Sequence, residues 1–434
     1  MKYTFFLIGL FITSLSFSQN LQLIDTTDYE KRKRLVTQFE TKYEHFNKGL
    51  KVSYKGAMRK QVQGFYKESQ ASFLEIIKNK KLLFEKDFQS YVDSLALVLK
   101  SNNVLLNDEA VNLYLAKNPM PNAFSIGDGT LILNIGLFSF LENEHQLLSV
   151  ISHEVAHQVL EHTKESIEKR AEINTTVLSR NSYESRSITA KKYKRGTRSF
   201  NLLKDLLYAE GEERRQQEIE ADSLGYILYK NTNAPKSEFV NSLRLLQKYD
   251  SVPSITVDSL IYRKLFDLPT LAFNNKWLKQ EDFNDYNYNH YKSKIDRDSL
   301  KDHPEIEQRI AKLQASFSEL KEASPGKPTD STFYKLQGIA RQASVENLYL
   351  LNEYGLSTYL ILKRLEDNID NSYYRNWLGV NFKAIYDAKK NYRLNRYIDR
   401  LAPNEQSESY QNFLSFMWNL KLDEIEKIAD YYLP

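Results

Sequence analysis

Three histidines and a glutamate lie close together in one short stretch, which reads ISHEVAHQVLEH from residue 151 to 162. His153 and His157 are four residues apart, so on a helix both rings share one face and can bind one metal ion. Glu154 lies about 100° around the helix and can serve as a general base. His162 lies about 140° from the shared face, which predicts a surface or capping residue and not a ligand.

A catalytic zinc site also needs a third protein ligand and an open fourth position. The segment EIEAD, residues 218–222, continues a second helical pattern and places Glu218 and Asp222 on one face. Glu218 can then be the third ligand, while Asp222 accepts an N–H from a metal-bound imidazole. Gly225 allows two helices to approach closely. By pattern alone, a solvated acidic face explains this segment equally well.

The elements that position these residues leave a readable pattern upstream. Residues 25–100 show a helical repeat with many charges, which predicts amphipathic helices. The histidine helix is predicted to begin after Asn143, because Gln146 follows three residues later as in a capping box. Its interior is apolar on most sides, so we expect it to be buried.

Two β-rich runs, at 111–116 and 130–135, come before the histidine helix. We expect the second run to be an edge strand that binds an extended substrate through main-chain hydrogen bonds, and a plain core strand is the alternative. The residues expected to position the substrate are Asn122, Ala123, Leu131 and Leu133.

Composition limits the chemistry. The chain has 434 residues and no cysteine, which excludes thiol nucleophiles and leaves histidine and carboxylate as the strong metal ligands. Lysine and arginine number 60 against 56 aspartates and glutamates, so no basic field indicates nucleic acid as a partner.

The first residues resemble a secretory signal peptide. An apolar run from Phe5 to Phe17 ends in a small-x-small pattern at Ser16 and Ser18. The run is shorter than the roughly 20 residues of a spanning helix, so we expect cleavage near Ser18, with an uncleaved anchor as the alternative. No later run could cross a bilayer. We therefore expect an exported, periplasmic or otherwise extracytoplasmic protein, and a basic cluster at 191–198 leaves peripheral contact with anionic lipid open.

The order of these pieces resembles one group of gluzincin metallopeptidases, the relatives of the CaaX prenyl protease, HtpX and the periplasmic β-barrel-assembly-enhancing protease. The resemblance extends over residues 85–315. It rests on the following succession of motifs: Asn122-Ala-Phe124, a glycine-rich turn, a strand, HEVAH, EIEAD, and His303-Pro304 with Arg309. Membrane-embedded members carry several long apolar helices, which this chain lacks, so it resembles the soluble periplasmic branch.

The resemblance implies an α+β, mostly α-helical fold, in which a zincin-like catalytic domain with a small sheet is followed by a helical C-terminal region. It also implies one zinc ion per chain, bound by His153, His157 and Glu218, with Glu154 as general base.

His303 precedes a proline at a predicted helix start and has three open interpretations. It can be a structural or capping residue, a latch that occupies the fourth zinc position, or a donor to the developing oxyanion. Arg309 matches the family's His-Pro-x-x-x-x-Arg pattern, and it can anchor this loop or face the developing charge.

The predicted organisation has four parts: a signal peptide at 1–18, N-terminal helices packed on the catalytic domain at 19–105, the zinc metallopeptidase domain at 106–322, and an α-helical C-terminal domain at 331–434. In the last part, Leu378, Gly379, Phe382 and Pro403 fall at the spacings of one tetratricopeptide unit, although Asn391 and Ile398 replace its small residues. This predicts either a docking domain for partner proteins or a simple helical cap.

The sequence as a whole predicts a zinc-dependent endopeptidase that acts on polypeptides with a metal-activated water, in envelope protein quality control. The alternative is a chaperone or scaffold of envelope protein assembly that acts mainly by binding through its C-terminal helices. HExxH and Glu218 favour the enzyme, because a scaffold has no need of Glu154.

Overall fold

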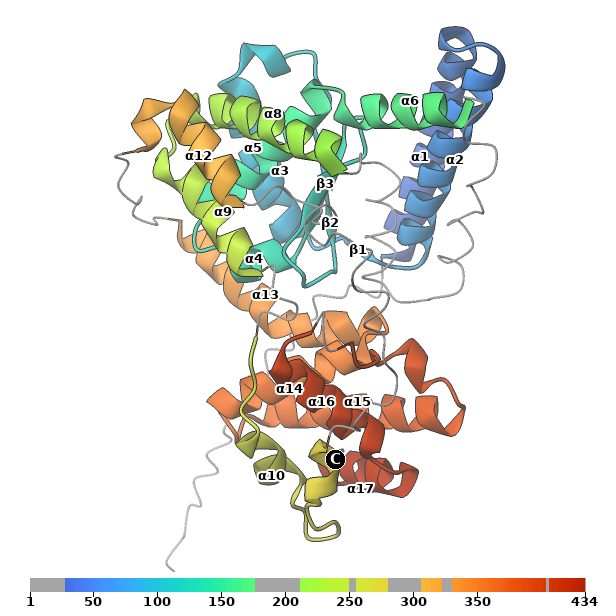
Figure 1. Ribbon diagram of the computed structural model, residues 1–434, viewed down its shortest axis with the longest axis vertical. Coiled ribbons are helices and arrows are strands. Elements are labelled where there is room, and N and C mark those ends of the chain that lie inside the picture. Colours follow the sequence, from blue (N-terminus) through green and yellow to red (C-terminus); the bar gives the residue numbers. More distant parts are fainter. Residues whose placement is uncertain are drawn as a thin grey trace, which may run out of the picture.

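The computed structural model describes residues 28–175, 211–249, 255–279, 306–321, 330–402 and 406–433. These residues form mainly helices, together with one four-stranded sheet. The predicted α+β, mostly α-helical fold class is confirmed. Figure 1 shows an upper part that contains the sheet and a lower part built from the C-terminal helices.

The sheet has the strand order β1-β2-β4-β3. Its strands are β1 (Leu82–Leu83), β2 (Asn112–Ala116), β3 (Ala123–Ser125) and β4 (Thr130–Asn134). β2 and β4 are parallel, while β1 pairs with β2 and β3 pairs with β4 in the antiparallel sense. The two runs expected to be strands are therefore confirmed as β2 and β4.

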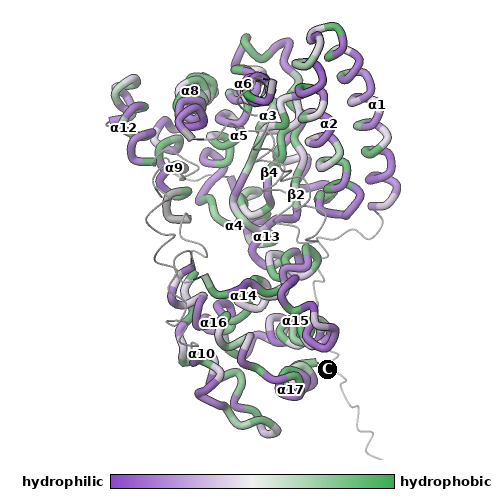
Figure 2. The backbone as a smooth tube through the Cα atoms, turned by 45° about the vertical axis from the view of Figure 1, so that its right-hand side comes forward, coloured by the Kyte–Doolittle hydropathy of each residue, from purple (hydrophilic) through white to green (hydrophobic). Residues whose placement is uncertain are grey.

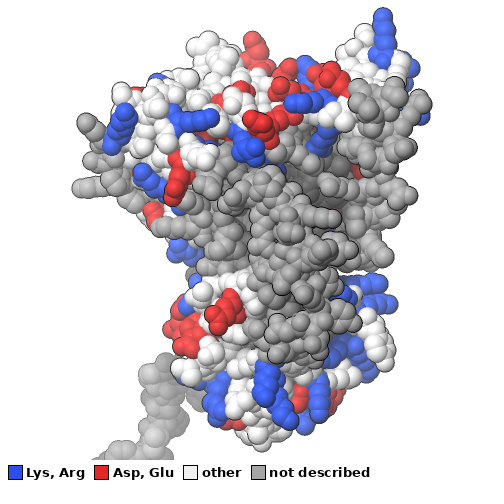
Figure 3. Space-filling view, viewed as in Figure 1, with Lys and Arg blue, Asp and Glu red and all other residues white. Residues whose placement is uncertain are grey.

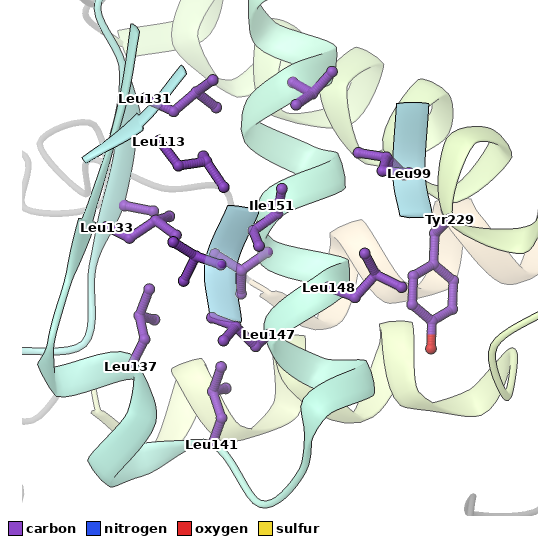
Figure 4. Packing of buried hydrophobic residues seen from close by; sticks show 14 of the residues in the cluster. Leu99, Leu113, Leu131, Leu133, Leu137, Leu141, Leu147, Leu148, Ile151 and Tyr229 are labelled. Carbon is purple, nitrogen blue, oxygen red and sulfur yellow. The ribbon is translucent and has the colours of Figure 1, made fainter. Parts of the chain in front are cut away.

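The expectation that β4 is an edge strand is wrong. β4 pairs with β2 on one side and β3 on the other. Its backbone N–H and C=O groups therefore bond within the sheet and are not available to a substrate strand. Leu131 and Leu133 are 0% exposed and point toward the histidine helix (Figure 4), which makes them core residues and not substrate contacts. β3 is the outer strand on this side, and at three residues it is too short to show a period in the sequence.

The strand side chains alternate between two hydrophobic cores, as the two-residue period of a strand requires. Leu113, Leu131 and Leu133 pack against α5 (Glu144–Val159), as Figure 4 shows. Tyr114 and Ile132 face the opposite way and pack with α1 (Tyr29–Ser53) and α2 (Gly56–Lys78). The sheet is thus covered by the histidine helix on one face and by α1 and α2 on the other.

The expected N-terminal helices are α1 (Tyr29–Ser53), α2 (Gly56–Lys78) and α3 (Lys86–Ser101). Figure 2 shows hydrophilic and hydrophobic residues alternating along α1 and α2, in agreement with an amphipathic pattern. The other elements of the upper part are η1 (Val104–Leu106), α4 (Gly136–Phe140), α6 (His162–Thr175), α8 (Gly211–Lys230), α9 (Ser237–Tyr249), α12 (Ile306–Ser316) and η7 (Ser318–Leu320).

One helix belongs to both parts of the molecule. α13 (Ser331–Leu350) buries Phe333 and Leu336 in the core of the upper part and Val345 in the core of the lower part. The lower part continues with α14 (Tyr354–Asp367), α15 (Ser372–Lys390), η8 (Leu394–Arg396), α16 (Glu408–Asn419) and α17 (Leu422–Tyr432).

α10 (Leu260–Phe266) and η5 (Asn275–Leu278) also pack into the lower core, although they lie within the predicted catalytic range 106–322. In α15, Leu378 and Phe382 are buried, whereas Pro403 of the proposed tetratricopeptide spacing lies outside the described residues. The predicted signal peptide also lies outside them.

Within the described segments, no helix combines the length and the apolar character needed to cross a bilayer. On the face shown in Figure 3, lysines and arginines are interspersed with acidic side chains over the described upper surface.

Candidate metal centre

The helix that carries HEVAH begins where the sequence predicts. Asn143 Oδ1 accepts a hydrogen bond of 3.0 Å from the backbone N–H of Gln146. Gln146 Oε1 accepts a hydrogen bond of 2.8 Å from the backbone N–H of Glu142. In a complete capping box it would accept from the N–H of Asn143 instead. This cap sets the start of α5 and thereby the position of its histidines.

Three side chains from two helices converge with their ligand atoms within 4.8 Å of one another: His153, His157 and Glu218. The Nε2 atoms of His153 and His157 are 3.1 Å apart. Glu218 contributes Oε2 at 3.4 Å from His153 Nε2 and Oε1 at 3.8 Å from His157 Nε2. Tetrahedral zinc with bonds of roughly 2.0–2.2 Å separates its ligand atoms by about 3.3–3.6 Å. The donor types and the spacing therefore fit a zinc ion, as the sequence predicts for these three residues.

Gly225 allows α8 to lie directly against α5, as the sequence suggests. A Cβ atom at this position would be 2.9 Å from His153 Cα and 3.2 Å from His153 N. These are backbone atoms, which cannot move aside as a flexible side chain can. The close approach brings Glu218 on α8 within reach of the two histidines on α5.

Behind His153 lies a buried ion pair. Asp222 Oδ1 is 3.0 Å from His153 Nδ1, which is the position expected for Asp222. Arg309 donates from Nε and Nη2 to the two Asp222 oxygens, at 2.6 Å each, and its Nη1 is 3.1 Å from Glu218 Oε2. This pairing is neither of the two roles expected for Arg309, and it places the guanidinium in contact with two carboxylates of the site.

The charges of this cluster shift the pKa values of its members. Burial lowers the pKa of His153, but hydrogen bonds to Asp222 and Glu218 outweigh burial and raise that pKa to about 10. Burial raises the pKa of Glu218, and the charge of Arg309 together with a His153 hydrogen bond overcomes this and holds it well below its usual range. Asp222 follows the same pattern, since Arg309 outweighs burial and lowers its pKa. Both carboxylates are therefore ionised at neutral pH.

His157 has a different environment from His153. Burial, followed by the nearby charge of His153, lowers the pKa of His157 well below its ordinary value. Its Nδ1 lies 2.9 Å from Nδ1 of His162, whose Nε2 lies 3.3 Å from Glu220 Oε2.

The expectation that His162 is a surface or capping residue is wrong. His162 is 1% exposed, because α5 ends before it and Glu161 adopts a φ of 54°. That turn redirects the chain, so the angle calculated for a continuous helix no longer applies. The sequence carries no evident signal for this contact.

The remaining expected residues are placed as follows. Glu154 is buried on α5 beside His153. Ala123 lies on β3, a strand in contact with α5, and its N–H donates to Asn122 Oδ1 at 2.9 Å. His303 lies outside the described residues.

The sequence model of peptidase family M48 matches residues 84–316, which is more than half of the chain and includes every residue of the metal cluster. The β-barrel assembly-enhancing protease of Yersinia pestis is 30% identical over 91 residues. That alignment covers 20% of this chain and 18% of the relative, so the similarity spans less than a fifth of the relative's length.

Proposed function

We propose, because the chain belongs to peptidase family M48, that it is a zinc-dependent endopeptidase that hydrolyses peptide bonds within polypeptides. The family resemblance identified from the motifs is thereby confirmed at the level of the family. The observation that carries the proposal is the His153, His157 and Glu218 cluster with the ligand spacing of zinc. Glu154 on the same helix provides a candidate base next to that cluster.

These three residues would hold one zinc ion per chain. When bound, zinc supplies a Lewis acid that polarises the scissile carbonyl and lowers the pKa of water toward about 7. Asp222 orients the His153 ring from its Nδ1 side, and Arg309 holds Asp222 in place. We assign Arg309 this positioning role because its three donating nitrogens all face Asp222 and Glu218.

In this proposal Glu154 is the general base. It follows His153 on α5 and is buried, so its carboxylate is shielded from bulk solvent. Glu154 takes up the proton of the attacking water and later gives it to the amine of the leaving peptide.

We propose that the substrate lies in extended form along β3. Residues 122, 124 and 126 turn their backbone groups toward β4, as the Asn134–Asn122 and Ile126–Thr130 hydrogen bonds and the strand register indicate. The N–H of Ala123 points the other way and donates to the side chain of Asn122. A substrate carbonyl that replaces Asn122 as acceptor would add the peptide to the sheet beside α5.

We further propose that the protein acts outside the cytoplasm, in quality control of envelope proteins. The support is the signal-like pattern of residues 1–18 and a relative named as a β-barrel assembly-enhancing protease. N-terminal sequencing of protein from cells should begin at or near Gln19. An intact Met1 in the cytosolic fraction would contradict this location.

The test of the activity is Glu154→Gln, with cleavage of a casein-type substrate and zinc content measured on the same preparation. The variant should keep about one zinc per chain and lose turnover by 10²-fold or more. Glu172→Gln, an exposed acid on α6, is the matched control and should cleave as the parent does.

Two results would contradict the proposal. If Glu154→Gln cleaves at the parent rate, Glu154 is not the base. If zinc-loaded parent cleaves no polypeptide, the chaperone or scaffold alternative is favoured.

A further inference from the structure

His162 is a buried histidine with no part in the hydrolysis proposed above. It is the first residue of α6 and follows directly after Glu161, whose φ is 54°. A non-glycine residue in this left-handed region costs about 1 kcal/mol or more, so the surroundings must maintain the turn. The turn brings the His162 ring to the His157 ring, with ring centroids 4.9 Å apart and ring planes at 73°.

If His157 binds a metal ion through Nε2, the contacts allow one consistent arrangement of protons. His157 Nε2 faces the other ligand atoms, 3.1 Å from His153 Nε2, so it must present a lone pair to a metal ion. Its Nδ1 then carries the proton and donates to His162 Nδ1, at 2.9 Å. His162 in turn carries its proton on Nε2, which faces Glu220 Oε2 at 3.3 Å. In this arrangement each ring nitrogen of His157 and His162 either faces the metal position or takes part in a hydrogen bond, and both rings are neutral.

We propose that His162 is a positioning residue for the metal centre: it accepts the Nδ1 proton of His157 and so fixes the tautomer and orientation in which His157 binds zinc. The inference rests on the proposed function, because it assigns His162 a task only if His157 is a metal ligand. Partners of this kind typically change metal affinity by about 10- to 100-fold when they are removed.

The two histidine ligands are oriented by different chemistry. His153 faces Asp222, a carboxylate fixed by Arg309. His157 faces a neutral ring, and the acid beyond that ring, Glu220, has a side chain that is 45% exposed. Since Glu154, Glu218 and Asp222 already bring buried carboxylates to the site, a neutral acceptor orients His157 without adding another.

His162 is held from three helices, which suits a positioning role. Its ring contacts His157 of α5, and its backbone carbonyl accepts from Ser166 Oγ of α6 at 2.7 Å. Glu220 of α8 is itself fixed by Gln216 Nε2, which donates to its Oε1 at 2.7 Å. Turning the acceptor nitrogen away from His157 would therefore also break the contact between His162 Nε2 and Glu220 on α8.

The experiment compares zinc affinity, measured by competition with a chromophoric chelator, and the visible absorption spectrum of the cobalt(II)-loaded protein. His162→Phe keeps the ring and removes the acceptor, and it should weaken zinc binding by about 10- to 100-fold and change the cobalt spectrum. His162→Asn places an amide oxygen where Nδ1 was and should lose less affinity. His145→Phe, which changes a histidine near the start of α5, eight residues before His153, is the matched control and should behave as the parent.

If His162→Phe does not fold, the comparison of His162→Asn with His162→Gln decides. The longer glutamine amide reaches toward Glu220 and not His157, so His162→Asn should bind zinc more tightly. Parent-like affinity and cobalt spectrum in His162→Phe, or equal affinities of the Asn and Gln variants, would overturn the inference and leave the zinc site intact. A parent protein that binds no zinc would overturn the proposed function as well.

Discussion

Arg309 binds both carboxylate oxygens of Asp222 through two hydrogen bonds of 2.6 Å, in a part of the structure from which solvent is excluded. The same guanidinium reaches Glu218 at 3.1 Å. Two acids one turn apart on α8 therefore share one cation from α12. The arrangement offsets their repulsion and holds both carboxylates in the orientation that the histidines require.

Replacing Arg309 should affect stability and metal binding together. Arg309→Gln leaves two buried carboxylates without their cation, which typically costs about 3–5 kcal/mol. Arg309→Lys should recover only part of this loss, because an ammonium group cannot make the paired contacts. Denaturant unfolding and zinc titration measure both effects. Lys312→Gln removes a positive charge from the exposed face of the same helix and serves as control. If Arg309→Gln is no less stable than this variant, the buried ion pair does not stabilise the fold.

Metal removal should abolish activity reversibly and lower thermal stability. Zinc that binds only the folded chain stabilises it by about 4 kcal/mol at a free concentration 1,000 times its Kd. Addition of zinc to chelator-treated parent should therefore raise the Tm and restore cleavage. Glu218→Ala lacks one of the three ligands, so its Tm should respond far less. An equal rise in Tm for both proteins would show that zinc binds elsewhere.

Gly225→Ala should weaken the site, because its Cβ would lie 2.9 Å from His153 Cα and push α8 away from α5. We expect a loss of stability of about 1–3 kcal/mol and weaker zinc binding. Gly338→Ala on α13 is the matched control, since nothing lies within 4 Å of the added Cβ. That change should stabilise the protein by about 0.5–1 kcal/mol. If the two alanine variants behave alike, the helix contact does not depend on Gly225.

The contact between Tyr91 and Asp330 should make stability depend on pH. The Tyr91 hydroxyl donates to Asp330 Oδ2 at 2.6 Å, and the N–H of Thr332 donates to Oδ1 at 2.8 Å. Burial raises the pKa of Asp330, but these hydrogen bonds outweigh it and lower the pKa. A lowered folded-state pKa gives stability that is present above the unfolded pKa of about 3.9 and lost as pH falls through the folded pKa.

Tyr91→Phe should therefore destabilise the protein at pH 7 by about 1 kcal/mol or less, since Asp330 is partly exposed. The difference from the parent should narrow below about pH 4. Urea unfolding at pH 7 and at low pH measures it. If the free energies of unfolding of parent and Tyr91→Phe differ more at low pH than at pH 7, the Tyr91 hydrogen bond does not stabilise ionised Asp330.

Features that depend on local geometry can be predicted from the amino-acid sequence alone. Residues four apart on a helix share a face whatever surrounds them, so the pairing of His153 and His157 could be predicted from spacing alone. The Asn143 cap and the strands β2 and β4 also follow from short-range hydrogen bonding and side-chain alternation. The place of Glu218 beside the histidines was predicted from a helical pattern and from the order of motifs.

The contacts between side chains from distant parts of the chain depend on how the helices and strands pack. The order of strands places β3 and not β4 at the edge, because strand pairing is a long-range choice that leaves no periodic signal in the sequence. The left-handed turn at Glu161 brings His162 onto His157, and the packing of α12 on α8 brings Arg309 onto Asp222. Both contacts depend on where one helix lies against another, which the spacing of residues within a single helix does not reveal.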